Sequence, residues 1–331
     1  MGASEIHKYG TEDGWHGKIE EGGEFPPEKD RYHLYIGLFC PFAHRVNLVR
    51  HIKHLTSIIT LDVVKPYPKD GGGWRFPATD DEYPGATVDS LFGSKFLSEV
   101  YFRDDKEYKG KYSVPLLWDK KAGRIVNNES AEMLRWLPDA FNSILPEDVK
   151  KINLYPEALR DKIDEVTPWM QSHINSGVYK AGFARTQEAY EAGVVPLFAA
   201  LNKLEALLAQ NGGPYILGKQ ITELDLRAYA TIIRFDTVYV QHFKTNLGTI
   251  RHDYPTLNNW HKNLYWHVEG FKESTDFKHI KENYTKSHGD VNPLAITPLG
   301  PYPEVEEGYE EDWGKVGVGK VRHPRVLQEK L

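Results

Sequence analysis

The strongest chemical signal in the sequence is its single cysteine, Cys40, which stands in the stretch LFCPFAHRV between an apolar run and Pro41. Proline is favoured in the first turn of a helix, so the pattern predicts that Cys40 lies at or beside a helix start. The unpaired N–H groups and the dipole there favour an anion such as a thiolate, and His44 and Arg45 add positive charge nearby. The sequence therefore predicts a nucleophilic thiolate at Cys40, against the alternative of a buried structural thiol.

A nucleophilic cysteine that forms a disulfide needs a second thiol to release it. In the dithiol redox pattern C-x-x-C the second cysteine fills that role, but Ala43 occupies the position here. Any disulfide on Cys40 must then be resolved by a thiol from outside the chain, and glutathione is the abundant candidate in the cytosol. One cysteine also excludes an internal disulfide framework, which favours a reducing compartment.

Two other patterns are weaker as ligand sites. GPYILGKQ at 213–220 nearly matches the phosphate-binding pattern G-x-x-x-x-G-K-[ST], but Gln220 breaks it and no strand precedes it. His44, His51 and His54 could share one helix face, but no carboxylate or cysteine joins them. We therefore expect neither a nucleotide site nor a metal site.

Apolar and β-branched runs place the cysteine within an α/β domain, where two parallel strands joined by a helix form a βαβ unit. The predicted elements are a strand at 32–39, a helix at 43–54, a strand at 57–66, two strands around a tight turn within 113–130, and a helix at 130–137 that Pro138 ends.

After about residue 150 helical patterns replace the strand patterns. In VVPLFAALNKLEALLAQNGG apolar residues recur at steps of three and four until two glycines follow, which predicts an amphipathic helix. Thr222 and Asp225 have the spacing of a capping box at the start of another helix. The sequence thus predicts an α/β domain followed by an all-α domain.

The length of 331 residues suits two domains. We expect an N-terminal arm over 1–28, an α/β domain over 29–150 with a long irregular loop at 67–95, an all-helical domain over 151–290 and a C-terminal extension over 291–331.

Charge and composition narrow the range of partners. The formal net charge of -6 argues against a general nucleic-acid binder. The first residues carry acids and no apolar core, unlike a signal or transit peptide. We find no run of about 18 apolar residues that would suit a membrane span. We expect a cytoplasmic protein with no nucleic-acid or membrane partner.

The order of the motifs resembles the cysteine-type glutathione transferases. CPFAHR is followed by SVPLLWD and NNES, and a helical domain comes after them. The long Trp-bearing loop, GVYKAGFARTQEAYE, VQHFKTN and YTKSHGDVNP are similar to one branch of that family, the glutathionyl-hydroquinone reductases or Xi class, which is related to the omega class. Members usually carry Trp where this chain has Phe42, a change that keeps an aromatic ring.

The resemblance implies a thioredoxin-like first domain, a homodimer and glutathione as co-substrate, with no metal. In that fold Pro115 would be cis. The implied residues are Cys40 as nucleophile, Trp74, Arg75, Val114, Pro115, Glu129 and Ser130 for glutathione, and Tyr179 and Tyr284 for the acceptor.

Elementary chemistry agrees with part of this set. Ser130 is expected to open a helix whose N-terminus suits a carboxylate, and Glu129 can pair with an ammonium, although an ordinary serine N-cap explains the same pattern. Arg75 and Lys95 are candidates to neutralise the glycyl carboxylate of glutathione. The sequence does not choose between these two basic residues.

The activity implied by the resemblance is the reductive removal of glutathione from glutathionyl-hydroquinones through a mixed disulfide on Cys40. Two alternatives stay open. One is a general thioltransferase or dehydroascorbate reductase of the omega type. The other is a binding protein that keeps the fold without the chemistry, and an intact Cys40 argues against it.

Overall fold

The computed structural model describes residues 14–70 and 73–300, which form two compact units. The first, called the α/β unit below, contains residues up to 153 together with 273–288; the second, the helical unit, contains 154–272 and 289–300. The sequence placed 273–288 in the helical domain, whereas the fold groups this segment with the α/β unit. The outer parts of the predicted arm and extension, 1–13 and 301–331, lie outside the described residues.

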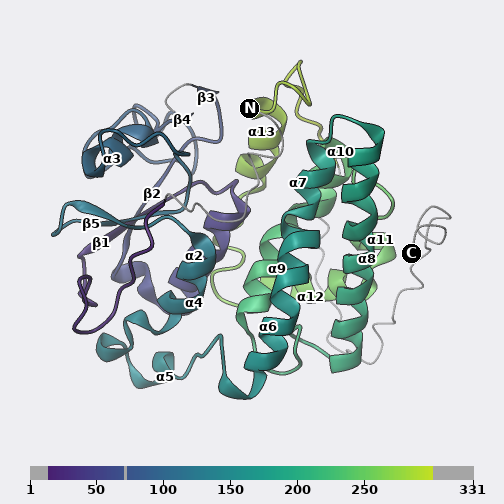
Figure 1. The fold of residues 1–331 in the computed structure, drawn as a ribbon, viewed down its shortest axis with the longest axis horizontal. Coiled ribbons are helices and arrows are strands. Elements are labelled where there is room, and N and C mark those ends of the chain that lie inside the picture. Colours follow the sequence, from purple (N-terminus) through teal and green to yellow (C-terminus); the bar gives the residue numbers. More distant parts are fainter. Residues whose placement is uncertain (1–13, 71–72, 301–331) are drawn as a thin grey trace. The chain divides into compact units, whose positions relative to one another are not determined.

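Four strands form the central sheet of the α/β unit, in the order β2-β1-β5-β6 (Figure 1). The strands are β1 (Tyr32–Ile36), β2 (Thr60–Val63), β5 (Leu116–Asp119) and β6 (Arg124–Asn127). β1 runs parallel to β2 and antiparallel to β5, and β5 runs antiparallel to β6. Every residue of β1 is buried, as expected for a strand covered on both faces. The mixed sheet is the thioredoxin-like arrangement that the resemblance implied.

Helices complete the α/β unit, with α2 and α4 side by side (Figure 1). They are α2 (Pro41–Ile52), α3 (Leu97–Asp104), α4 (Ser130–Ala140), α5 (Glu147–Lys150) and α13 (Phe277–Ser287), with short turns η1 (Leu55–Ser57) and η2 (Asn142–Ile144). The sequence did not predict α3. It was also wrong about the end of α4, which continues through Pro138.

The described part of the arm lies along the edge of the sheet. Gly17 N donates to the carbonyl of Val126 in β6 at 2.8 Å. Ile19 and Phe25 are buried, which fixes the arm by apolar contact as well. The arm therefore covers an edge strand that would otherwise expose unpaired backbone groups.

The helical unit contains no strand among its described residues. Its elements are η3 (Glu157–Leu159), α6 (Arg160–Trp169), η4 (Met170–Asn175), α7 (Gly177–Gly182), α8 (Gln187–Asn211), α9 (Glu223–Arg234), η5 (Phe235–Tyr239), α10 (Val240–His242), α11 (Ile250–Asp253) and α12 (Pro255–His267). α8 runs beside α7 (Figure 1) and ends at Gly212, whose φ of 68° suits a left-handed cap. The capping box at α9 is confirmed, because Thr222 N donates to the Asp225 carboxylate at 2.8 Å.

One helix, α8, is long and apolar enough by composition to cross a membrane. It has 25 residues and a window of mean hydropathy 1.5, although the sequence had suggested no such segment. In this fold 56% of that window is buried inside the protein. Its apolar residues pack against α7 and α12, as in the core helix of a helical domain.

Candidate active site

Cys40 is the N-cap residue of α2, and Pro41 occupies the first turn, as the sequence predicted. The backbone at Cys40 is extended, and its carbonyl accepts the N–H of His44 at 2.9 Å. The thiol is partly exposed, and its Sγ donates to the carbonyl of Val114 at 3.6 Å. The sulfur therefore lies at a helix start, where backbone dipoles stabilise a negative charge.

The segment that faces the thiol contains a cis peptide bond. The Val114–Pro115 bond is cis, as the resemblance implied, and both residues are buried just before β5. Since the carbonyl of Val114 is the atom in contact with Sγ, the structure brings Cys40, Val114 and Pro115 together.

The start of α4 is connected to α2 by Arg45. Arg45 Nη2 donates to Ser130 Oγ at 2.6 Å and lies 4.0 Å from Glu129 Oε1. Glu129, and not Ser130, is the N-cap, with its carboxylate accepting from Ala131 N at 2.8 Å. A carboxylate and a hydroxyl thus flank the N-terminus of α4, held by a buried guanidinium.

The two basic residues of α2 near the thiol bond to other segments of the α/β unit. Arg45 points to the start of α4, and the buried His44 shares a hydrogen bond of 2.9 Å with Ser274 Oγ. Both side chains therefore connect α2 to other segments of the α/β unit, and the positive charge expected near the thiol stays a prediction.

The long loop brings Trp74 to the residue before the cysteine. Trp74 lies in β4 (Gly73–Trp74), which pairs with β3 (Lys69–Asp70), and its ring centroid is 4.4 Å from that of Phe39. Trp74 is only 9% exposed. The predicted Trp therefore packs on the residue before the cysteine, from a short hairpin that the sequence patterns did not predict.

Arg75 and Lys95 both lie against one aromatic ring. The guanidinium carbon of Arg75 is 5.3 Å from the ring centroid of Phe96, and Lys95 Nζ is 5.5 Å from the same centroid. A backbone bridge joins Arg75 to Phe96 as well. The structure brings these two basic residues together, and each remains a candidate for an anionic ligand group.

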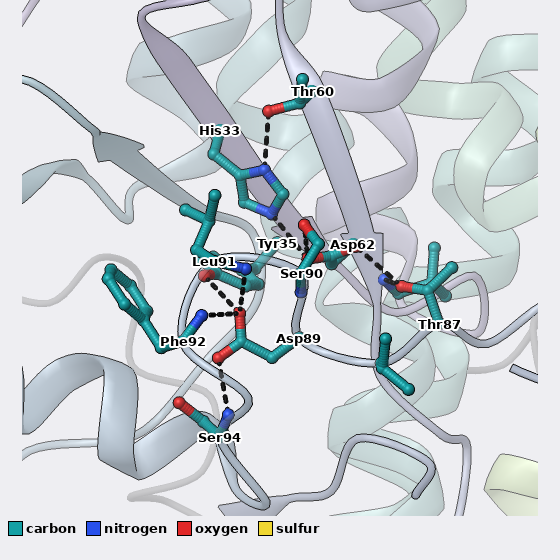
Figure 2. Close-up of polar contacts among 12 residues, drawn as sticks. His33, Tyr35, Thr60, Asp62, Thr87, Asp89, Ser90, Leu91, Phe92 and Ser94 are labelled. Carbon is teal, nitrogen blue, oxygen red and sulfur yellow. Dashed lines mark hydrogen bonds and ion pairs between the residues drawn. The ribbon is translucent and has the colours of Figure 1, made fainter. Parts of the chain in front are cut away.

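A buried polar network fixes the far end of this loop to the sheet (Figure 2). Asp62 at the end of β2 lies 3.1 Å from His33 Nε2 and accepts from Ser90 Oγ at 2.7 Å. Asp89 accepts from Tyr35 at 2.9 Å and from the backbone N–H of Ser94. The loop that bears Trp74 is therefore held through strands β1 and β2.

Electrostatics in this network favour a charged carboxylate. Burial raises the pKa of Asp62, but hydrogen bonds from His33 and from Ser90 outweigh it, so the pKa lies below its usual value. An ionised Asp62 is thus part of the folded state around neutral pH.

Helix α13 holds the other end of the loop and carries Tyr284. Asn283 Nδ2 donates to the carbonyl of Pro66 at 2.8 Å, and His279 Nε2 lies 2.7 Å from the carbonyl of Pro84. Tyr284 is buried, with its ring 5.5 Å from that of His288. The helix that presents Tyr284 therefore also fixes the loop that presents Trp74.

Tyr179 lies in the helical unit, within a cluster of aromatic rings. Its ring centroid is 5.4 Å from Phe243, 6.1 Å from Tyr239 and 6.3 Å from Phe183, and the residue is 7% exposed. The two predicted acceptor tyrosines thus belong to different units of the chain.

One residue that the sequence analysis missed joins two parts of the predicted glutathione site. The hydroxyl of Tyr101, in α3, donates to Ser113 O at 2.8 Å and accepts from Asn128 Nδ2 at 3.3 Å. Ser113 precedes Val114, and Asn128 precedes Glu129. A buried Tyr101 hydroxyl was not recognisable in advance, since its partners are 12 and 27 residues away.

Residues 14–70 and 73–300 contain no group of three or more His, Cys, Asp or Glu side chains that could hold a metal ion. The arrangement around Cys40 instead suits thiol chemistry with a ligand that has anionic and ammonium ends.

Two family models match the chain: the glutathione S-transferase N-terminal domain over residues 39–140 and the glutathione S-transferase C-terminal domain over residues 187–263. The chain is 51% identical over 283 residues to glutathione S-transferase omega-like 2 of Schizosaccharomyces pombe, spanning 85% of this chain and 89% of that protein. It is 42% identical over 310 residues to the glutathionyl-hydroquinone reductase YqjG of Escherichia coli, spanning 94% and 91% respectively.

A solved structure agrees over the same length. The Xi glutathione transferase ECM4 of Saccharomyces cerevisiae, in complex with glutathione, matches with a TM-score of 0.84 and 38% identity, covering 88% of this chain and 98% of that one. The similarity therefore extends across both units of the fold.

Proposed function

The chain belongs to the glutathione S-transferase family and is of its Xi type, and from that premise we propose that it reduces glutathionyl-hydroquinones to hydroquinones with glutathione. The observation that supports this most is Cys40 at the N-cap of α2, where a thiolate is stabilised. A protein thiolate captures glutathione as a disulfide, whereas conjugation needs the thiolate of glutathione itself.

Glutathione binding is assigned to the groups around Cys40. The backbone of Val114, before the cis Pro115, would take the cysteinyl part. The start of α4, with Glu129 and Ser130, would take the γ-glutamyl end, since a carboxylate suits a helix N-terminus and an ammonium suits Glu129. Trp74 would lie against the tripeptide, and Arg75 is the candidate for the glycyl carboxylate. The E. coli relative named as a glutathionyl-hydroquinone reductase supports this reaction class.

The first chemical step is attack by the Cys40 thiolate on the sulfur of the aromatic thioether. The new S–S bond joins Cys40 to glutathione, and the S–C bond to the ring breaks with its electron pair on the ring carbon. That carbon takes a proton, which gives the free hydroquinone. Cys40 is thereby oxidised to a mixed disulfide, and the ring carbon is reduced.

In the second step a glutathione thiolate attacks the mixed disulfide at the glutathione sulfur. Oxidised glutathione forms, and the electron pair of the broken bond returns to Cys40 as a thiolate. No other cysteine exists in the chain to resolve the disulfide, so the reaction consumes external glutathione.

Tyr179 and Tyr284 are the proposed contacts of the aromatic acceptor. Each hydroxyl would donate to a ring oxygen, and one would supply the proton to the leaving carbon. Both rings are held by neighbouring aromatic groups, which restricts the direction of each hydroxyl.

An omega-type thioltransferase is the second candidate, because the Schizosaccharomyces pombe relative is named omega-like. Such an enzyme uses the same thiol with a disulfide substrate in place of an aromatic thioether. The two candidates share the mixed disulfide and differ in the acceptor.

The test is a steady-state assay with glutathione and glutathionyl-menadione, comparing the wild type with Cys40→Ser, with intact mass recorded for each. Release of hydroquinone by the wild type alone, with a glutathione adduct on Cys40, is expected. An adduct without hydroquinone release would favour the thioltransferase. If neither hydroquinone nor the adduct forms, both candidate reactions are contradicted, and a binding protein is favoured.

Cytoplasmic location and a homodimer are part of the same proposal. The chain contains a single cysteine, which suits a reducing compartment. Light scattering of the purified protein tests the dimer, and cell fractionation tests the location. A monomeric mass would contradict the homodimer, and secretion of the protein would contradict the cytoplasmic location. Neither result would bear on the proposed reaction.

A further inference from the structure

A lysine on the Trp74 hairpin lies close to the start of the thiol helix. Lys69 pairs with Trp74 between β3 and β4, and its Nζ lies 4.7 Å from the centroid of the Trp74 ring. That ring packs against Phe39, with 4.4 Å between centroids, and Phe39 is the residue before Cys40. The hairpin thus brings a positive charge to the aromatic pair formed by Trp74 and Phe39, next to Cys40 in the chain.

The charges of Lys69 and Cys40 act on each other. Burial of the ammonium lowers the pKa of Lys69, while the negative charge of Cys40 raises it and the neighbouring Lys111 lowers it. Coulomb attraction is reciprocal, so an interaction that favours the charged lysine favours the thiolate equally. Lys69 is an exposed residue, so the interaction is sensitive to salt.

The other basic side chains near this helix start have different main contacts. His44 bonds Ser274, Arg45 bonds Ser130, and Arg75 lies on Phe96. These contacts lie before α13, at the start of α4 and at the N-cap of α3 respectively. Lys69 differs because its ammonium rests on the ring that touches the residue next to the thiol.

We propose that Lys69 stabilises the Cys40 thiolate, so that the nucleophile is charged at neutral pH by two sources, the start of α2 and the ammonium on the Trp74 hairpin. The proposal rests on the proposed function in taking Cys40 as the nucleophile. It adds a charge-stabilising residue from the long loop, and explains why a loop held at both ends would matter for reactivity as well as for binding.

The single cysteine makes the test specific, since alkylation of the native full-length protein by iodoacetamide reports on Cys40 alone. The pH midpoint of the alkylation rate is measured for the wild type and for Lys69→Gln. We expect the midpoint to rise by about half a unit to one unit in the variant, as for a nearby partly solvated charge. Lys69→Arg should keep the midpoint near that of the wild type.

Lys121→Gln is the matched control, because it removes the same charge from the same unit at the turn between β5 and β6. An unchanged midpoint in Lys69→Gln, or an equal shift in Lys121→Gln, would overturn the proposal. Circular dichroism confirms that each variant is folded. Alkylation needs neither glutathione nor an acceptor, so it tests the role of Lys69 separately from the reaction. A shifted midpoint without hydroquinone release would support the role of Lys69 and contradict only the proposed function.

Discussion

The α/β unit and the helical unit hold their candidate residues by different means. In the α/β unit, buried carboxylates and hydroxyls bond loops to strands, as Asp62 and Asp89 do (Figure 2). In the helical unit, Tyr179 is held by neighbouring rings, and its helix α7 packs closely on α8. Polar anchors place backbone segments for a polar ligand, whereas ring packing fixes the orientation of an aromatic side chain.

This difference predicts which property each variant changes. A lost hydrogen bond in the α/β unit shifts a ligand-binding segment, so glutathione binding should weaken. A lost hydroxyl on a tyrosine beside other rings, such as Tyr179 in the helical unit or Tyr284 on α13, leaves the ring packing in place, so acceptor chemistry should change while glutathione binding does not. The following experiments test this separation, beginning with the largest expected effect.

The largest effect is expected when both acceptor tyrosines lose their hydroxyls. Tyr179→Phe with Tyr284→Phe should lower hydroquinone release by about 100-fold, because two donors to the ring are removed and the rings remain. The measurement is kcat with glutathionyl-menadione, with KM for glutathione recorded in parallel. Unchanged turnover in the double variant would remove both residues from the mechanism.

Close packing between α7 and α8 gives the next effect. A Cβ at Gly193 would stand 2.7 Å from the backbone N of Ala181, an atom that cannot move aside. Gly193→Ala should lower the free energy of unfolding by about 1–3 kcal/mol, measured by urea denaturation. Gly289→Ala is the control in the same unit, since a Cβ there meets nothing within 4 Å. Equal stability of the two variants would contradict the close packing.

Two buried carboxylates predict opposite responses to pH. Burial raises the pKa of Asp225 in the helical unit from 3.8 to about 6, despite hydrogen bonds from Ile216, Thr222 and Trp260. The stability that protonated Asp225 contributes is full below 3.8 and is lost as the pH rises through about 6. The pKa of Asp62 is lowered, so its contribution is full above 3.8 and is lost as the pH falls below that value.

The measurement is the free energy of unfolding by urea at several pH values. Between pH 5 and pH 7.5, loss of the Asp225 proton should lower the free energy of unfolding of the wild type by roughly 1–2 kcal/mol. Asp225→Asn should remove this part of the fall. Asp62→Asn should instead reduce the loss of stability in acid. Identical pH profiles for the two variants would show that the carboxylates do not differ as described.

The smallest effect is expected at Tyr101. Tyr101→Phe removes a hydroxyl that bonds Ser113 and Asn128, and a hydrogen bond of about 1 kcal/mol corresponds to a roughly fivefold rise in KM for glutathione. The alkylation rate of Cys40 and kcat should stay unchanged, which a general loss of structure would not allow. Tyr108→Phe is the control, since that hydroxyl bonds Lys111 O in the same aromatic cluster. An unchanged KM would contradict a positioning role.

Local patterns predicted much of the fold and part of the site. The helix start at Cys40, the capping box at Thr222 and the turn between β5 and β6 each depend on residues within a few positions. At that turn Asp119 accepts the N–H groups of Lys121 and Ala122, which a short stretch of sequence can specify. Motif order then predicted the family, and the cis bond at Pro115 was confirmed.

Contacts between distant residues were the part that sequence patterns missed. The partners of Arg45 and His44 are 85 and 230 positions away, so their directions followed from the packing of α2. Helix α13 joined the α/β unit for the same reason, through bonds such as that of Asn283 to Pro66, 217 residues apart.

The sequence by itself determined that this protein has one thiol at a helix start and that an external thiol must resolve any disulfide on it. Only the tertiary structure decided what lies beside this segment, because Val114 contacts the thiol and Trp74 packs on Phe39 from separate parts of the chain. Helix starts are set by backbone groups within one turn, whereas a charge beside a sulfur depends on how distant segments pack.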